Sequence, residues 1–236
     1  IIENSAMEPE ITDLADCLNK MGSKININNN GVIKIIGVNK LNSTKHNIMS
    51  DRIVAGTFVI AAVMLNKKFE VKKIQSKHLE ALTSALQEMG ANVKLKENII
   101  KILPTKKLNG IKIQTAPYPG FPTDLQAQIM VLLCKANKNS IIEENIFENR
   151  FMHVAELNRM GAKILTKSNK ALVEGNITFA PAELMATDLR ASVSLILAAL
   201  SAKGKSIINR IYHLDRGYEN IEKKLKKVGA KIRRVN

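Results

Sequence analysis

The sequence predicts an α/β protein made of repeated units with the order β-α-β-α-β-β, each about 70 residues long. Three observations predict it. A glycine recurs at a nearly constant spacing, an amphipathic helix precedes each glycine, and helices that are apolar on nearly all sides recur between them. The glycines stand 68, 71 and 68 residues apart, at Gly22, Gly90, Gly161 and Gly229. Such regular spacing is typical of repeated structural units.

An amphipathic helix is expected before each glycine. Apolar residues recur there every three or four positions, which places them on one face of a helix with 3.6 residues per turn. Pro9 suits the first turn of the first helix, and Gly22 suits the position just after its end. The apolar residues of that helix are Ile11, Leu14, Leu18 and Met21. The pattern returns at 79–89, 154–160 and 218–228.

A strand is expected after each glycine, and two of these strands are expected to continue into hairpins. Residues 24–28 and 32–36 flank Asn29-Asn30-Gly31, a sequence that is typical of tight turns. Residues 163–166 and 171–173 have the same apolar alternation and predict the second hairpin.

Three further segments are apolar on nearly all sides and predict helices buried inside a layered domain. They span residues 57–65, 127–133 and 191–200. Each follows a turn that carries an aspartate, namely Asp51, Asp124 or Asp188.

These repeats divide the chain into modules at 49–115, 116–184 and 185–236. We therefore expect residues 49–236 to form three repeats, and residues 1–48 to be the tail of an earlier repeat. Residues 1–48 lack an inner helix, the last module lacks a closing hairpin, and the sequence does not begin with Met. The chain is expected to be part of a longer protein.

Composition argues against several classes of protein. Apolar residues make up 45% of the chain, which is too many for a disordered protein. The longest apolar runs are much shorter than the roughly 20 residues of a membrane span. The two cysteines lie on apolar helix faces and the four histidines lack metal-ligand spacing, so we expect no disulfide, metal or cofactor. A reduced, cytoplasmic compartment is the default.

The net charge of +15 raises the question of nucleic-acid binding. Lysines are spread over the whole sequence, aromatic residues make up only 4%, and no recognised nucleic-acid motif occurs. Nucleic-acid recognition requires a focused basic patch, so the lysines are interpreted as solvating the surface.

The aspartates before the apolar helices are the first candidates for chemistry. Helix N-termini attract anions, and a threefold repeat would bring Asp51, Asp124 and Asp188 together with Arg52 and Arg190. The alternative is that the aspartates merely cap their helices. Asp124 is the exception, because the proline-rich segment 117–122 aims it rigidly. Arginines also suit anionic substrates, and the candidates are Arg52, Arg150, Arg190 and Arg216.

Two other groups of residues are expected to be structural. Cys17 and Cys134 lie on packed helix faces, whereas a reactive cysteine needs exposure and a positive environment. From pattern alone, Phe147 and Phe151 are expected to be core residues.

Four motifs together carry a resemblance to a known family: residues 117–128, 145–153, 185–192 and 210–219. The chain resembles bacterial UDP-N-acetylglucosamine enolpyruvyl transferases from residue 1 to its C-terminus, over a little more than the last half of the family's length. The resemblance implies an inside-out α/β barrel in each of two domains, with substrates in the cleft between them. Residues 1–48 would then be the C-terminal end of the first barrel domain, and residues 49–236 the second barrel domain without its N-terminal strand segment. The resemblance also implies a cytoplasmic enzyme of peptidoglycan synthesis.

The resemblance implies roles for individual residues. The family transfers enolpyruvyl from phosphoenolpyruvate to the 3′-hydroxyl of the sugar nucleotide and releases phosphate. Asp124 matches the general base, Arg216 matches an arginine that holds phosphoenolpyruvate, and Ile146 matches a sugar-nucleotide contact. The remaining residues expected to contact substrate are Phe147, Arg150, Asp188 and Arg190.

The chain departs from the family in one large respect. The family's N-terminal Lys-Asn pair and its loop with an acid cysteine are absent, so the 236 residues alone are expected to be inactive without that N-terminal half. Three alternatives stay open: an enolpyruvyl transferase acting on shikimate 3-phosphate, a non-catalytic remnant of a split gene, and a basic nucleic-acid binder.

Overall fold

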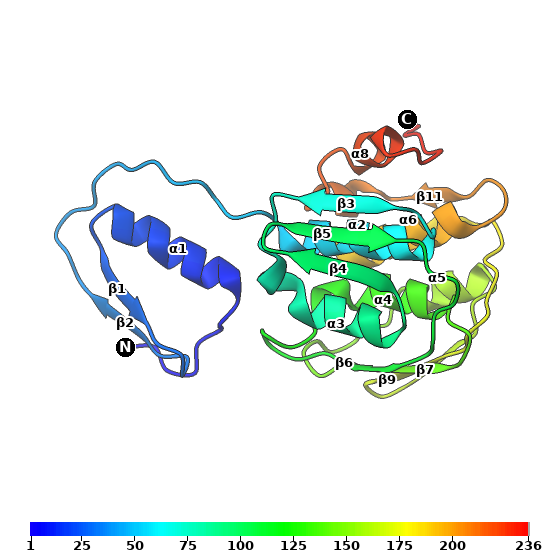
Figure 1. The fold of residues 1–236 in the computed structure, drawn as a ribbon, viewed down its shortest axis with the longest axis horizontal. Helices are drawn as coiled ribbons and strands as arrows, with labels where there is room; N and C mark the ends of the chain where they lie inside the picture. Colours follow the sequence, from blue (N-terminus) through cyan, green and yellow to red (C-terminus); the bar gives the residue numbers. More distant parts are fainter. Residues whose placement is uncertain (236) are drawn as a thin grey trace.

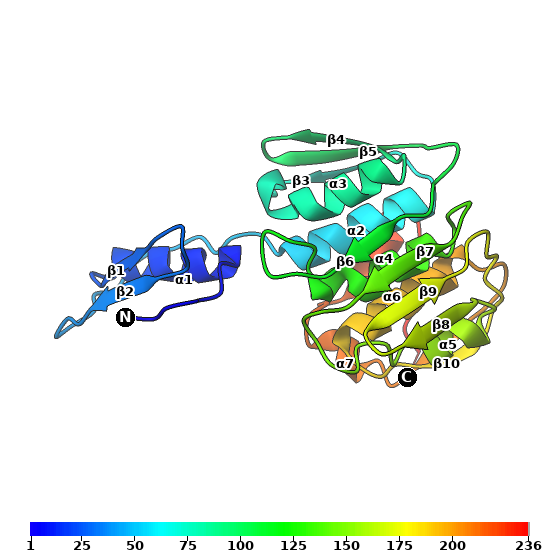
Figure 2. The ribbon, with the colours of Figure 1, turned by 90° about the horizontal axis from the view of Figure 1, so that it is seen from below.

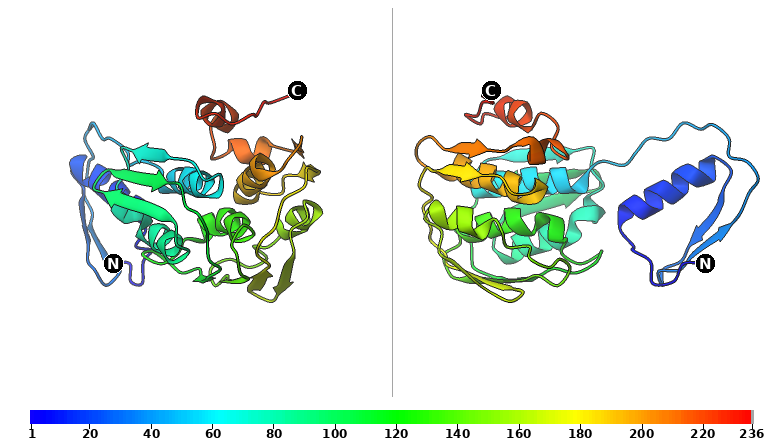
Figure 3. Two further views of the ribbon diagram at one scale, coloured as in Figure 1. Left: turned by 45° about the vertical axis from the view of Figure 1, so that its right-hand side comes forward. Right: turned by 180° about the vertical axis from the view of Figure 1, so that it is seen from behind.

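The computed structural model describes residues 1–235, and its first part is a helix packed beside a hairpin. Helix α1 (Pro9–Lys20) is followed by strands β1 (Lys24–Ile27) and β2 (Ile33–Ile36), which pair antiparallel as predicted. Residues 37–50 have no regular structure and lead to the remainder of the chain. The right-hand view in Figure 3 places α1, β1 and β2 to one side of that remainder.

The first of the three repeats, residues 49–115, contains one buried helix and one covering helix (Figure 1). Its elements are α2 (Arg52–Met64), β3 (Phe69–Lys72), the 3-10 turn η1 (Ser76–Leu79), α3 (Glu80–Glu88), β4 (Asn92–Lys96) and β5 (Ile99–Leu103). The three strands form an antiparallel sheet with the order β3-β5-β4.

The middle repeat has the predicted order β-α-β-α-β-β in full. Its elements are β6 (Lys112–Gln114), the 3-10 turn η2 (Thr123–Leu125), α4 (Gln126–Leu133), β7 (Ser140–Glu143), α5 (Val154–Arg159), β8 (Ile164–Lys167) and β9 (Lys170–Val173). The strands form a sheet with the order β6-β7-β9-β8, in which only β6 and β7 run parallel.

The last repeat is shorter within residues 1–235. Its elements are β10 (Glu183–Met185), α6 (Leu189–Ser201), β11 (Ile207–Asn209), α7 (Tyr212–Asp215) and α8 (Ile221–Lys227). Strands β10 and β11 pair parallel, as β6 and β7 do. The prediction of a strand after Gly229 is wrong, because residues 230–235 have no regular structure. A strand needs a hydrogen-bonding neighbour, and none lies beside this segment in the described chain.

The three apolar helices α2, α4 and α6 lie at the centre, with sheets and other helices around them (Figure 2). Every residue of α4 is buried, and α2 and α6 are buried over most of their length. Each Leu, Ile or Val buried in this way contributes roughly 1.5–3 kcal/mol. Helices inside and strands outside are the inside-out arrangement that the resemblance implied.

The repeated glycines have the conformation that the sequence predicted. Gly22, Gly90, Gly161 and Gly229 have φ of +101°, +86°, +89° and +97° just after a helix. Positive φ values of this size are readily adopted by glycine and are strained for residues with a Cβ. Each glycine therefore ends its helix.

The first helix differs from its prediction in burial. Leu14, which was placed on the packed face of α1, is 57% exposed. The hairpin β1-β2 is the only sheet beside α1 in residues 1–235, and two strands cover only part of the helix. No helix of the described residues is long and apolar enough to cross a membrane.

Candidate functional site

Two of the three aspartates before the central helices are helix caps. The Asp51 carboxylate accepts hydrogen bonds from the backbone N–H groups of Ile53 and Val54, at 2.8 and 2.9 Å. The Asp188 carboxylate accepts from those of Arg190 and Ala191, also at 2.8 and 2.9 Å. Both bind N–H groups left free by the first turn of a helix, as the capping alternative predicted.

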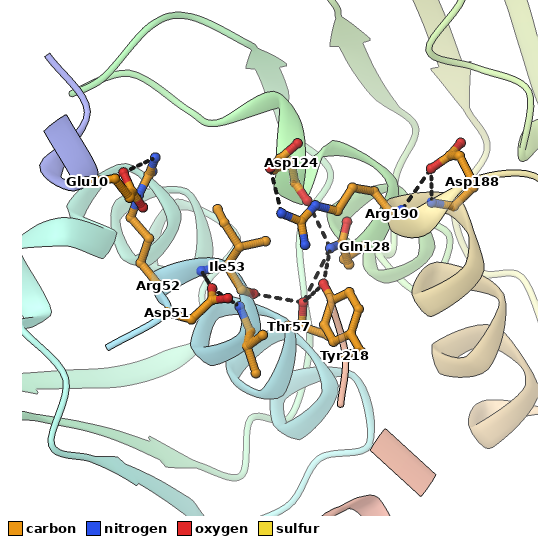
Figure 4. Close-up of polar contacts among 12 residues, drawn as sticks. Glu10, Asp51, Arg52, Ile53, Thr57, Asp124, Gln128, Asp188, Arg190 and Tyr218 are labelled. Carbon is orange, nitrogen blue, oxygen red and sulfur yellow. Dashed lines mark hydrogen bonds and ion pairs between the residues drawn. The ribbon is translucent and has the colours of Figure 1, made fainter. Parts of the chain in front are cut away.

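Asp124 is different, because its side chain makes no capping hydrogen bond at η2. Its Oδ1 accepts from Arg150 Nη2 at 2.9 Å, and its Oδ2 accepts from Arg190 Nη2 at 2.8 Å. The Asp124 side chain is 39% exposed, whereas those of Arg150 and Arg190 are only 14% and 16% exposed. The carboxylate is therefore open to a ligand and held by two cations, of which Figure 4 shows Arg190.

Arg190 keeps its positive charge in this position. Burial lowers its pKa, but the hydrogen bond and charge of Asp124, together with Tyr218, outweigh burial and leave the pKa above its ordinary value. A permanently cationic group beside an exposed carboxylate suits a substrate that carries carboxylate or phosphate.

Arg52 does not join this cluster, and the predicted gathering of all the aspartates and arginines is wrong in this respect. Its guanidinium donates to both carboxylate oxygens of Glu10 in α1, at 2.9 and 3.3 Å, and lies 5.7 Å from the centre of the Tyr118 ring. Figure 4 shows Arg52 and Asp51 apart from the Asp124–Arg190 pair. Asp51 stays at its helix because its carboxylate is occupied by capping.

A loop beside Arg150 forms a hollow of about 640 Å³ lined by residues 144–152, 166, 168 and 169. Phe147 is 59% exposed on this loop and lies 5.0 Å from the Arg150 guanidinium. The prediction that Phe147 belongs to the core is therefore wrong, because the loop turns its ring outward. Phe151 packs partly buried against the core as predicted. Ile146 is exposed on the same loop.

Glu144 anchors this loop and was missed by the sequence reasoning. Its buried carboxylate accepts from the backbone N–H groups of Ile146 and Phe147, at 3.0 and 3.1 Å. It also accepts from the hydroxyls of Thr115 and Thr123, at 2.8 and 2.9 Å. Since Thr123 precedes Asp124, one carboxylate joins the Ile146 loop to the turn that carries Asp124.

Arg216 is exposed on the turn after α7, and its side chain makes no ion pair with any residue of 1–235. The turn itself is seated on the start of α6, because a Cβ at Gly217 would lie 2.9 Å from a methyl carbon of Leu189. Tyr218, the next residue, is almost fully buried and contacts α2 and α4. The sequence reasoning treated Tyr218 only as a helix-face residue.

The remaining titratable candidates are structural. Burial raises the pKa of the Cys134 thiol to about 12, which leaves it without nucleophilic character near neutral pH. Burial lowers the pKa of His153 to about 4. No cluster of His, Cys, Asp and Glu side chains suited to a metal occurs in residues 1–235.

Fold and cluster together define a class: an α/β protein of repeated units in which two of the three buried helices, α4 and α6, begin at an arginine–carboxylate cluster. The chain belongs to the EPSP synthase (3-phosphoshikimate 1-carboxyvinyltransferase) family, whose model matches residues 1–225.

Within this family the chain is similar to UDP-N-acetylglucosamine 1-carboxyvinyltransferases. It is 60% identical to that of Pelagibacter ubique over 235 residues, covering 100% of this chain and 56% of the relative. It is 52% identical to that of Geotalea uraniireducens, with the same coverage. The chain thus spans about half the length of the curated relatives it matches.

Solved structures agree on the fold. The enolpyruvyl transferase NikO from Streptomyces tendae has a TM-score of 0.90 at 27% identity, over 98% of this chain and 55% of its own. An EPSP synthase from Acinetobacter baumannii has a TM-score of 0.76 at 18% identity, over 94% of this chain and 55% of its own, and supports the fold alone.

Proposed function

We propose that this chain forms part of an enzyme that transfers enolpyruvyl from phosphoenolpyruvate to the 3′-hydroxyl of UDP-N-acetylglucosamine and releases phosphate, in peptidoglycan synthesis. The observation that carries the proposal is Asp124, an exposed carboxylate fixed between Arg150 and Arg190. It is supported by relatives with 60% and 52% identity that are named for this sugar nucleotide.

In the proposed mechanism Asp124 accepts the proton of the sugar hydroxyl. Each of its oxygens is bound to one arginine and, like any carboxylate oxygen, keeps a further lone pair for a second donor. The hydroxyl oxygen then adds to the central carbon of phosphoenolpyruvate while the methylene carbon takes up a proton. In the second step the resulting methyl carbon gives up a proton, the double bond forms again and phosphate leaves. A carboxylate held within hydrogen-bond reach of that proton is suited to general base catalysis.

The other roles follow from charge and position. Arg216, Arg190 and Arg150 offer cations for the carboxylate and phosphate of phosphoenolpyruvate. The hollow with Ile146 and Phe147 supplies an apolar surface for the nucleotide. Asp188 fixes the start of α6 and thereby the backbone of Arg190.

The proposal assigns the remaining groups of the site to protein outside these 236 residues, because the chain covers only 56% of the Pelagibacter ubique relative. It follows that the chain alone is inactive, and that the N-terminal part of the relative is the partner it requires. The two domains of the proposed enzyme meet near residue 48.

A chimaera tests this proposal. The uncovered N-terminal part of the Pelagibacter ubique enzyme would be joined to this chain, and phosphate release would be measured with phosphoenolpyruvate and UDP-N-acetylglucosamine. We expect release by the chimaera and none by the chain alone. Activity of the chain alone would contradict the proposed division. Activity with shikimate 3-phosphate instead of the sugar nucleotide would contradict the proposed acceptor.

A further inference from the structure

Tyr218 lies at the meeting point of the three central helices. Its hydroxyl is 2.9 Å from Thr57 Oγ1 in α2 and 3.2 Å from Gln128 Nε2 in α4. Its ring lies 5.7 Å from the guanidinium carbon of Arg190 in α6. All of Tyr218, Thr57 and Gln128 are at most 2% exposed, so water does not replace these contacts.

The hydrogen bonds of this group run in one direction. The carbonyl oxygens of Ile53 and Asp124 can only accept, so Thr57 donates to the first at 2.9 Å and the Gln128 amide nitrogen donates to the second at 2.9 Å. Having donated its hydrogen, Thr57 accepts from the Tyr218 hydroxyl, which in turn accepts from Gln128 (Figure 4). Gln128 Nε2 also donates to Thr57 Oγ1 at 3.3 Å, so Tyr218, Thr57 and Gln128 form a triangle of hydrogen bonds that joins α2 to the Asp124 backbone.

The same residue fixes the turn that carries Arg216. The backbone N–H groups of Gly217 and Tyr218 both donate to the carbonyl of Leu214, at 3.2 and 3.0 Å. With its ring buried and its hydroxyl bonded on two sides, Tyr218 prevents the turn from sliding along α6.

We propose that Tyr218 is a positioning residue of the site described above. Its hydroxyl holds Gln128 and through it the Asp124 backbone, its ring supports the Arg190 guanidinium, and its backbone sets the place of Arg216. This inference rests on the proposed function for its kinetic consequences and on the contacts above for its structural ones.

The test is Tyr218→Phe in the chimaera, which keeps the ring and removes the hydroxyl. Tyr212→Phe is the matched control, because Tyr212 is exposed on the same segment and, within residues 1–235, its hydroxyl accepts only from Arg210. For Tyr218→Phe we expect kcat to fall and KM for phosphoenolpyruvate to rise, each by about fivefold or more, because two buried polar groups lose a partner. KM for UDP-N-acetylglucosamine changes less than KM for phosphoenolpyruvate, because Glu144 holds the Ile146 loop by hydrogen bonds that do not involve Tyr218.

A merely structural role gives a different pattern. A smaller fraction of folded enzyme lowers kcat and leaves both KM values unchanged. That pattern, or kinetics equal to those of Tyr212→Phe, would overturn the inference.

A double-mutant cycle tests the contact with Arg190. If the Tyr218 ring acts partly through Arg190, the increase in KM for phosphoenolpyruvate from Tyr218→Phe to Tyr218→Leu, which removes the ring, is smaller in an Arg190→Lys background than in the unchanged protein. Fully multiplicative effects would remove Arg190 from the inference and leave only the hydroxyl network.

Hydrogen exchange separates this inference from the proposed function. If the chimaera shows no transferase activity, the proposed function fails, and amide exchange of residues 123–128 and 188–192 still decides the role of Tyr218. We expect faster exchange in both segments for Tyr218→Phe than for Tyr212→Phe. Equal exchange in the two variants would overturn the inference.

Discussion

At the scale of single residues, the site depends on what each aspartate is bonded to. The carboxylates of Asp51 and Asp188 accept hydrogen bonds from helix N–H groups, and that of Asp124 accepts from two arginine side chains. Aspartates at equivalent positions of the repeat thus have two different chemical environments. Of the three, only Asp124 is both paired with arginines and open to a ligand.

Asp124→Asn in the chimaera is predicted to reduce turnover by about 10² or more, as expected for loss of a general base. The matched control is Asp51→Asn, because asparagine caps helices as well as aspartate does. Phosphate release measures both variants. Equal turnover in the two would remove Asp124 from the proposed mechanism.

His153 predicts a pH dependence of stability. Burial lowers its pKa from 6.5 to about 4, so the unfolded chain binds a proton in this interval and the folded chain does not. Stability is therefore complete above about pH 6.5 and falls as the pH drops toward 4, by roughly 3 kcal/mol in total. Urea unfolding at pH 7 and pH 5 measures this slope.

His153→Gln, which does not titrate, is the comparison for that slope. We expect the variant to lose less stability than the unchanged protein between these two pH values. An identical slope in both proteins would contradict the lowered pKa.

At the scale of elements, most of the architecture was predictable, because helices and strands leave local signals. The glycines, the apolar faces and the Asn-Gly turn identified the ends of the helices and the hairpin β1-β2. The proline-rich segment also correctly predicted that Asp124 would not cap a helix. Tyr218 and Glu144 could not be predicted, since their hydrogen bonds join residues up to 161 positions apart. Phe147 was misjudged because an apolar residue in a loop has no periodic pattern to show its direction.

Gly161→Ala is predicted to lower the free energy of unfolding by about 1 kcal/mol, because its φ of +89° strains a residue with a Cβ. The added methyl would meet only a carbonyl oxygen at 3.9 Å, so a clash contributes nothing. Gly37→Ala is the control, since no atom lies within 4 Å of its added methyl and its φ is not in the left-handed region. Chemical unfolding measures both, and equal stability would contradict the argument from φ.

At the scale of the whole molecule, a few polar contacts connect α1 to the central helices. Besides the Arg52–Glu10 pair, the Tyr118 N–H donates to Glu8 Oε1 at 3.3 Å. The segment 37–50 has no regular structure, so these contacts rather than the connection fix the position of α1. A domain boundary near residue 48 stays a prediction.

Glu10→Gln is predicted to raise the rate of tryptic cleavage after Lys40 and Lys45 by about two- to fivefold, because the partly buried Arg52–Glu10 pair restrains α1 modestly. Glu3→Gln is the control, since Glu3 makes no ion pair within residues 1–235. Mass spectrometry of the first fragments gives the rates. Equal cleavage of the two variants would show that the pair does not restrain α1.

The 3-10 turn at Thr123–Leu125 has a consequence for how such a protein acquires chemistry. Because α4 is preceded by this turn, Asp124 does not cap its helix, whereas Asp51 and Asp188 cap α2 and α6. In a fold of repeated units, equivalent residues can therefore have different functions. In two repeats the aspartate stabilises its helix, and in the third its carboxylate is available for chemistry. The site is then the outcome of altering how one helix starts, with no new element added.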